Sequence, residues 1–255
     1  MTDINSLPAR TKPKLWEPPT PQLIRGAKVF IVGYKADPVA LADHLPPGLK
    51  PHPNGLVQMN LYQVGPDQTS GFGPFTLTYI TIEVDGYDSD LAEGAGTIPG
   101  RYFAYYWNSS SRVRNYVRDN VGAKAQHGDT RKETKKGGKL ISTLTLDGRD
   151  VISVIATVGD KIVATLGGHL NYYAHREVLR PDGGAPVVSE LLELPLPFVA
   201  DVYESKLHDI TFDFPEGHPA ARLRPLKPLD APSVLHADTT FTYSMGRTIK
   251  NYLAP

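Results

Sequence analysis

Residues 141–168 read ISTLTL-DG-RD-VISVIATV-GD-KIVATLGG, and this stretch decides the fold class. Short runs of alternating apolar and β-branched residues are typical of β-strands. The Asp147-Gly148 pair favours a two-residue hairpin turn, and Gly159-Asp160 gives a second turn signal further along. The stretch therefore predicts three consecutive antiparallel strands joined by two turns.

The rest of the chain also favours strands over helices. Runs rich in Val, Ile, Thr and Tyr recur on both sides of the central stretch. They predict strands over residues 28–34, 56–64, 75–84, 102–107, 187–194, 206–214 and 235–243. We expect a polar loop over residues 127–138 and a helix-like terminal segment over residues 247–253.

Two short helices interrupt this strand pattern. Asp37 followed by Pro38 offers an N-cap and a proline at the first helical position, so a helix begins there. Within residues 109–121, valines recur at helical spacing behind serine caps, and Gly122 then ends the second helix. The sum is a mainly β (α+β) chain with few helices.

Length and composition favour one ordinary globular domain. The chain has 255 residues, of which 40% are hydrophobic and 21% are charged. Residues 1–22 carry five prolines and predict an extended N-terminal arm, with Trp16 as a residue that could dock it. We therefore expect an arm over residues 1–22 and a single domain over residues 23–255.

Charge and cysteine content limit the classes of partner and the kinds of site that we expect. The 27 Lys and Arg residues balance the 27 Asp and Glu residues, so neither a nucleic acid nor an anionic membrane is an expected partner. The sequence shows neither a membrane-spanning run nor a signal peptide, and we expect a cytoplasmic protein. It contains no cysteine, and no metal or cofactor is expected. A small molecule is the expected ligand.

Residues 117–126 read Val-Arg-Asp-Asn-Val-Gly-Ala-Lys-Ala-Gln, and they resemble a lysine motif. In the acetoacetate decarboxylase superfamily this motif reads Gly-Arg-Glu, two variable residues, Gly, an aromatic residue and Pro-Lys-Lys. Arg118, Asp119 and Gly122 match it without a gap, and Ala125 and Gln126 then stand where the family has its two lysines. Weaker resemblances follow in family order at residues 45–51, 70–75, 155–161, 171–172, 190–191 and 206–211, so the similarity spans about residues 28–253.

This resemblance implies a fold and a chemistry. The family fold is an antiparallel, cone-shaped β-barrel in a single domain, with the active site inside and a tendency to form homo-oligomers. The family reaction begins when a neutral lysine amine attacks a ketone and forms an imine that accepts electrons. The expected substrate is therefore a small oxo acid or ketone, and the expected outcome is decarboxylation or aldol condensation followed by dehydration.

The chain departs from the family pattern where the chemistry is done. Ala125 and Gln126 replace the lysine pair, Leu77 stands where an active-site glutamate is usual, and Asn60 stands where a second glutamate is common. Neutral groups have thus replaced charged ones, which argues against decarboxylation of a β-keto acid.

Three residues are candidates for catalysis. Lys124 can serve as the amine if the helix end is wound differently by one residue, because such a shift turns a side chain to another face; otherwise it is an exposed lysine. His127 beside the same turn can move a proton, unless it belongs to an ordinary polar loop. Tyr252 is the third candidate and belongs to a group of tyrosines that either line the barrel or pack in its core.

Eight further residues are candidates for substrate binding. Tyrosine hydroxyls and amides in a narrow barrel suit a neutral carbonyl or hydroxyl compound better than a dicarboxylate. Arg25 lies near the position of a family arginine that is associated with the active site. The candidates are Arg25, Gln58, Asn60, Leu77, Tyr79, Tyr102, Arg118 and Gln126.

Three hypotheses about function remain open at this point. The first is a lyase of the family kind that acts through a Schiff base at Lys124. The second is an enzyme of the same fold that uses acid–base chemistry without an imine on a neutral carbonyl substrate. The third is a non-catalytic barrel that binds a small molecule. The direction of the Lys124 side chain discriminates the first from the second.

Overall fold

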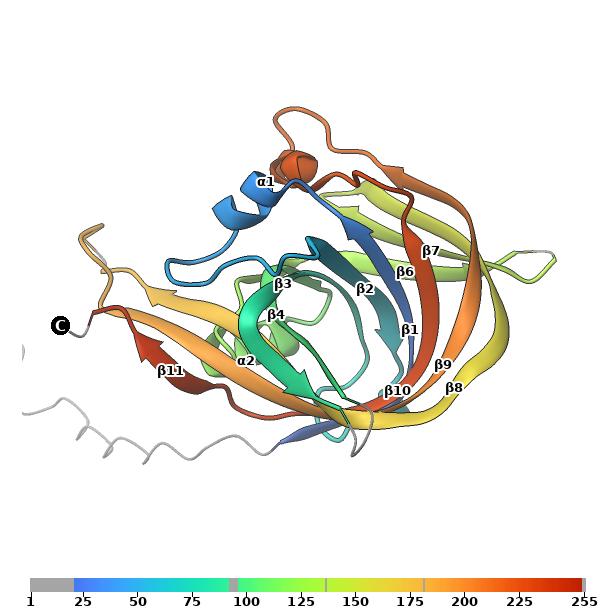
Figure 1. The fold of residues 1–255 in the computed structure, drawn as a ribbon, viewed down its shortest axis with the longest axis horizontal. Helices are drawn as coiled ribbons and strands as arrows, with labels where there is room; N and C mark the ends of the chain where they lie inside the picture. The colour runs from blue at the N-terminus through green and yellow to red at the C-terminus, as the bar shows by residue number, and fades with distance from the viewer. Residues whose placement is uncertain (1–20, 92–95, 136, 181, 254–255) are drawn as a thin grey trace, which may run out of the picture.

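The computed structural model describes residues 21–91, 96–135, 137–180 and 182–253. Within these ranges the chain forms one curled sheet with few helices, as expected for a mainly β fold (Figure 1). The strands are β1 Gln22–Lys35, β2 Leu56–Val64, β3 Phe75–Asp90, β4 Thr97–Asn108, β5 Ala125–His127, β6 Asp129–Thr134, β7 Lys139–Leu146, β8 Arg149–Val178, β9 Val188–Phe212, β10 Ser233–Tyr243 and β11 Arg247–Asn251. The helices are α1 Pro38–Asp43 and α2 Ser111–Asn120, with the 3-10 segments η2 Pro66–Gln68 and η3 Pro219–Leu226.

The sheet closes on itself as a ring of strands. Its pairings run β9-β10-β1-β2-β3-β4-β8, and β8 pairs again with β9. Most of these pairs are antiparallel, but β4 pairs in parallel with β8 through Arg101↔Tyr172 and Tyr102↔Tyr173. The short strand β5 also lies parallel to β4. The ring is therefore antiparallel, as expected, except for parallel pairing of β4 with β8 and with β5.

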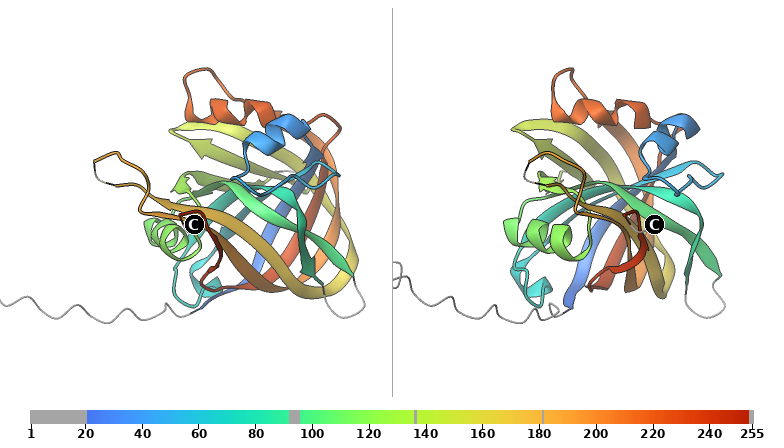
Figure 2. Two further views of the ribbon diagram at one scale, coloured as in Figure 1. Left: turned by 60° about the vertical axis from the view of Figure 1, so that its left-hand side comes forward. Right: turned by 90° about the vertical axis from the view of Figure 1, so that its left-hand side faces the viewer.

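The long strands β8 and β9 serve two hydrophobic cores. Their register shifts near residues 155–166, so the hairpin bends there. The second half of β8 and the first half of β9 close the ring around an inner core that includes Phe103 and Leu194. The other halves, together with β7, α1 and η3, cover the outer face of the ring around Phe30 and Val154 (Figure 2). Each such buried side chain contributes about 1.5–3 kcal/mol to the free energy of unfolding.

Local signals for turns and helix ends are confirmed where they are strongest. Asp147 and Gly148 both have positive φ and join β7 to β8 as a hairpin turn. The side chain of Asp37 accepts bonds from the first amides of α1, and that of Ser110 does the same for α2. Gly122 ends α2 with φ +83°.

Three other expectations about elements are wrong. Gly159-Asp160 does not reverse the chain, because this region of β8 is bulged and remains paired with β9. Residues 127–138 are not simply a loop, since β6 pairs with β7 there. Residues 247–253 are not helical, because β11 pairs with β9. The N-terminal arm falls almost wholly on residues 1–20, which lie outside the described residues.

The described helices offer no candidate for a bilayer span, since each of them is too short or too polar.

A substitution at Gly100 tests how tightly β4 packs against its neighbours. A Cβ atom at this position would lie 2.1 Å from the Tyr87 carbonyl oxygen and 2.7 Å from the Tyr173 ring. Because a backbone oxygen cannot move cheaply, we expect Gly100→Ala to lower the free energy of unfolding by about 1–3 kcal/mol in a urea titration. Gly159→Ala is the control, since its Cβ would meet its nearest atom at 3.4 Å. Equal stability of the two variants would contradict this packing.

Candidate functional site

A mostly apolar cavity of about 340 Å³ lies inside the ring of strands. It forms because side chains alternate between the two faces of a strand, so every second residue of β1, β2 and β10 points inward. Among the apolar lining residues are Val29, Phe103, Leu196, Ala237 and Phe241. The volume is at the lower end of the range for cavities that hold small ligands.

Polar side chains gather at one end of this cavity. The Nδ2 atom of Asn60 donates to the Tyr79 hydroxyl at 2.5 Å, and the hydroxyls of Tyr79 and Tyr172 lie 3.1 Å apart. Gln58 and Arg101 line the same cavity. Side chains with hydrogen-bonding groups from β2, β3, β4 and β8 therefore line the cavity together with the apolar residues.

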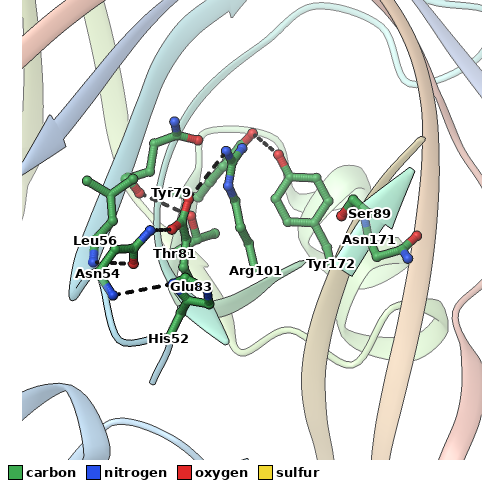
Figure 3. A network of polar contacts seen from close by, with 11 residues as sticks. His52, Asn54, Leu56, Tyr79, Thr81, Glu83, Ser89, Arg101, Asn171 and Tyr172 are labelled. Atoms are coloured by element: carbon green, nitrogen blue, oxygen red, sulfur yellow. Dashed lines mark hydrogen bonds and ion pairs between the residues drawn. The ribbon is translucent and has the colours of Figure 1, made fainter. Parts of the chain in front are cut away.

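Arg101 is held by a buried partner on the neighbouring strand. Its guanidinium lies 3.8 Å from a carboxylate oxygen of Glu83, whose side chain is 4% exposed. The other carboxylate oxygen of Glu83 accepts a 2.6 Å hydrogen bond from Asn54. Figure 3 shows Arg101 between Glu83 and Tyr172. The pair places opposite charges next to each other at the polar end, as cross-strand pairs commonly do.

Three polar atoms of cavity-lining residues are buried without a hydrogen bond in the part of the chain that the structure describes. They are Gln58 Oε1, Asn60 Oδ1 and Arg101 Nε. A buried polar atom without a partner costs about 1–3 kcal/mol. Two acceptors and one donor are thus available to a ligand or to water.

Burial keeps four tyrosines of the inner core neutral. Burial raises the pKa of Tyr79 well above its ordinary value, and the neighbouring Tyr172 raises it further. Burial likewise raises the pKa values of Tyr62, Tyr106 and Tyr243. These four hydroxyls therefore stay protonated at physiological pH, and those of Tyr62, Tyr79 and Tyr243, which line the cavity, can donate hydrogen bonds to an oxygen atom of a ligand.

The structure brings three of the sequence-predicted binding residues together, because Gln58, Asn60 and Tyr79 all line the cavity. Leu77 is fully buried in the inner core without lining the cavity. Tyr102 belongs to a smaller separate cluster that also contains Leu49, and burial raises its pKa to about 12. These placements leave the functional roles of all five residues as predictions.

The lysine motif lies outside the cavity. Lys124 has a side chain that is 67% exposed, and its Nζ lies 4.0 Å from Glu177. It lines a separate surface pocket of about 680 Å³ together with Arg118, Gln126 and His175. Ala125 points the other way into the inner core and is 1% exposed. The chain thus has an alanine on the inward side of this turn and its lysine on the outward side.

The remaining candidates also lie outside the cavity. His127 is exposed, 3.7 Å from Asp129. Arg25 is exposed at a bulge of β1, and Gln126 accepts a hydrogen bond from Arg222. The Tyr252 ring packs against His175, 5.1 Å away. None of these candidates lines the cavity, and their roles remain predictions.

Sequence reasoning missed Glu83, Arg101 and Tyr172. Glu83 is a charged residue within the buried part of β3. A charged residue in such a run indicates a buried charge that needs a partner, so the sequence does contain a signal for this pair. The sequence marks Asn171-Tyr172 only as a segment that resembles the family, without a role for Tyr172 in the site. The meeting of Arg101 and Tyr172 depends on the parallel junction of β4 and β8, which strand periodicity does not predict.

Comparisons with known proteins agree with this architecture. The family model described as acetoacetate decarboxylase matches residues 6–253. An acetoacetate decarboxylase structure from Legionella pneumophila is similar with 19% identity and a TM-score of 0.74, covering 98% of this chain and 96% of that chain. An acetoacetate decarboxylase-like enzyme from Sphingomonas wittichii has 16% identity and a TM-score of 0.67, with 90% and 92% covered.

A further solved structure is an enduracididine biosynthesis enzyme, MppR, in complex with pyruvate. It has 18% identity and a TM-score of 0.66, and the match covers 94% of each chain. At these identities the structural likenesses establish the fold. A comparison with curated protein sequences gives no match.

Removal of the Tyr79 hydroxyl tests the hydrogen-bond network at the polar end of the cavity. Tyr79→Phe removes the acceptor of the Asn60 amide and the neighbour of the Tyr172 hydroxyl, so we expect the free energy of unfolding to fall by about 1–3 kcal/mol. Tyr116→Phe is the matched control, because the buried Tyr116 hydroxyl has no hydrogen bond to a described residue. Chemical denaturation measures both variants. An equal or larger loss in Tyr116→Phe would contradict this network.

Proposed function

This chain belongs to the acetoacetate decarboxylase family, and we propose that it binds a small, mostly apolar ketone or aldehyde inside its ring of strands and polarises the carbonyl group without forming an imine. The observation that carries this proposal is the composition of the cavity. Its described lining residues include tyrosine, amide and guanidinium groups but no lysine. An imine needs a lysine amine at the ligand.

Charge balance at the polar end favours a neutral ligand. Glu83 partly neutralises the Arg101 guanidinium, which lines the cavity. A ligand carboxylate would have to lose its hydration and compete with Glu83 for Arg101, which is costly for a charge in an apolar cavity. A ketone or aldehyde oxygen needs only hydrogen-bond donors, and this end of the cavity supplies them.

The same donors can stabilise charge on a carbonyl oxygen. Tyr79 and Tyr172 stand beside each other, and Arg101 has a buried Nε with no hydrogen bond to a described residue. Fixed donors aimed at a developing oxyanion in a water-poor site lower the barrier to reaction. The proposed role of the cavity is therefore carbonyl binding and polarisation, with the apolar walls holding the rest of the ligand.

A Schiff base at Lys124 is the second candidate function. The observation in its favour is the pocket that Lys124 shares with His175, a potential acid or base. The Lys124 side chain is 67% exposed and its Nζ lies 4.0 Å from Glu177, so it lacks the apolar burial that activates a lysine amine for attack on a carbonyl. The surroundings of Lys124 therefore support this route less well than the cavity supports the first.

A ligand series tests the proposed function. We expect methyl ketones of increasing chain length to raise the melting temperature until the chain no longer fits the cavity, and carboxylates of equal length to raise it less. Ala237→Phe should abolish this shift, because the larger side chain fills the cavity from a buried position. Tyr79→Phe should weaken binding about tenfold through the loss of one donor.

Lys124→Ala is the control and should bind the ketones as the parent protein does. Borohydride added to the protein with pyruvate or a methyl ketone should leave Lys124 unmodified. An adduct at Lys124 that forms at low ketone concentration, with ketone binding unaffected in Ala237→Phe, would overturn the cavity proposal in favour of the imine. A change of the ketone itself, followed by nuclear magnetic resonance, would separate turnover from binding alone.

A further inference from the structure

A second hollow lies on the opposite face of the strands that line the cavity. It is a groove of about 1010 Å³ between β1, β10 and β9 on one side and β6 on the other. Its lining is more polar than that of the cavity. Lys28, Lys132, Tyr203, His236 and Asp238 all contribute to it.

Strand alternation explains why one set of strands carries two sites. On β10, Ala237 points into the cavity while its neighbours His236 and Asp238 point into the groove. On β1, Val29 lines the cavity and Lys28 lines the groove. The groove is therefore independent of the proposed carbonyl site inside the ring.

Lys132 reaches across from β6 to the outer face of β1. Its Nζ donates a 2.6 Å hydrogen bond to the backbone oxygen of Lys28 and lies 5.1 Å from the centre of the Phe30 ring. Its pKa is lowered to about 8, mainly by burial and also by the Lys28 cation, while Asp238 acts in the opposite direction. The other ionisable groups that line this groove are Glu133, Tyr203 and His236.

His236 adds no positive charge at neutral pH. Burial lowers its pKa to about 4, with Lys132 and Lys28 acting in the same direction. Its Nδ1 atom and the Oδ1 atom of Asp238 are buried without a hydrogen bond to any described residue. Both atoms belong to groove-lining residues and are available to hydroxyl groups of a ligand.

We propose that the groove is a second, amine-reactive site in which Lys132 condenses with a hydroxylated aldehyde or ketone. A neutral amine is required, and burial beside another cation is the environment that favours one. The amine nitrogen forms a bond to the carbonyl carbon, the carbon–oxygen bond breaks, and the oxygen leaves as water with the two amine hydrogens. The product is an imine, and no oxidant or reductant takes part.

The buried atoms without a hydrogen bond indicate that the ligand carries hydroxyl groups. Asp238 Oδ1 can accept a hydrogen bond from a ligand hydroxyl, and His236 Nδ1 can donate or accept according to its tautomer. An apolar aldehyde of the same length would leave both atoms unsatisfied. The groove therefore differs in ligand chemistry from the apolar cavity on the other face.

Brief reductive labelling of the native protein tests this site. Glyceraldehyde and cyanoborohydride are added between pH 6.5 and 10, and adducts are located by peptide mass spectrometry. A lysine with a pKa near 8 has about two hundred times more neutral amine at pH 7.5 than an ordinary lysine. We expect Lys132 to be labelled at least tenfold faster than the exposed Lys124, with a half-maximal rate near pH 8.

Two variants and one probe sharpen the result. Lys132→Arg keeps the charge and should remove the fast adduct, whereas Lys28→Met should raise the pH of half-maximal labelling at Lys132 by removing the neighbouring cation. Lys124→Met is the control and should change neither. Propanal, which lacks hydroxyls, should show a smaller preference for Lys132 over Lys124 than glyceraldehyde does.

Labelling that follows side-chain exposure, with Lys124 ahead of Lys132 at every pH, would overturn the site. Equal preference of propanal and glyceraldehyde for Lys132 would overturn the hydroxylated class of ligand.

Discussion

Closure of the sheet by the bent hairpin of β8 and β9 is the constraint on which the rest of the structure depends. Register shifts near residues 155–166 let one hairpin close the ring with its inner half and cover the outer face with its other half. Without that bend, neither hydrophobic core would be complete. The same closure brings β8 beside β4, where Arg101 and Tyr172 pair and form part of the polar end of the cavity.

The two faces of the ring carry different chemistry. The inner face holds an apolar cavity whose hydrogen-bonding groups include tyrosine hydroxyls, amides and the Arg101 guanidinium beside Glu83. The outer face holds a polar groove where Lys132 is partly desolvated. Because the faces alternate residue by residue, a substitution at Ala237 acts on the cavity while its neighbour His236 belongs to the groove.

Alternation of side chains along the chain also determines which way Lys124 of the lysine motif points. Ala123 and Ala125 point into the inner core, so Lys124 between them points outward. Around them the inner core is filled by aromatic rings, including those of Tyr79 and Tyr106, which stack with a centroid distance of 6.1 Å. The space inside the turn is thus occupied by aromatic residues and small side chains.

The sequence by itself determined the mainly β class, the Asp147-Gly148 hairpin, the capped helix behind Ser110 and the family, because these depend on short-range signals and collinear motifs. It named Gln58, Asn60 and Tyr79 as lining candidates, from the barrel expectation and the family resemblance together, and all three line the cavity. Only the tertiary structure decided that Gly159 lies in a bulge, that Arg101 meets Tyr172 and that Lys124 faces solvent. These outcomes depend on how strands distant in sequence pair, and local periodicity carries no information about such pairing.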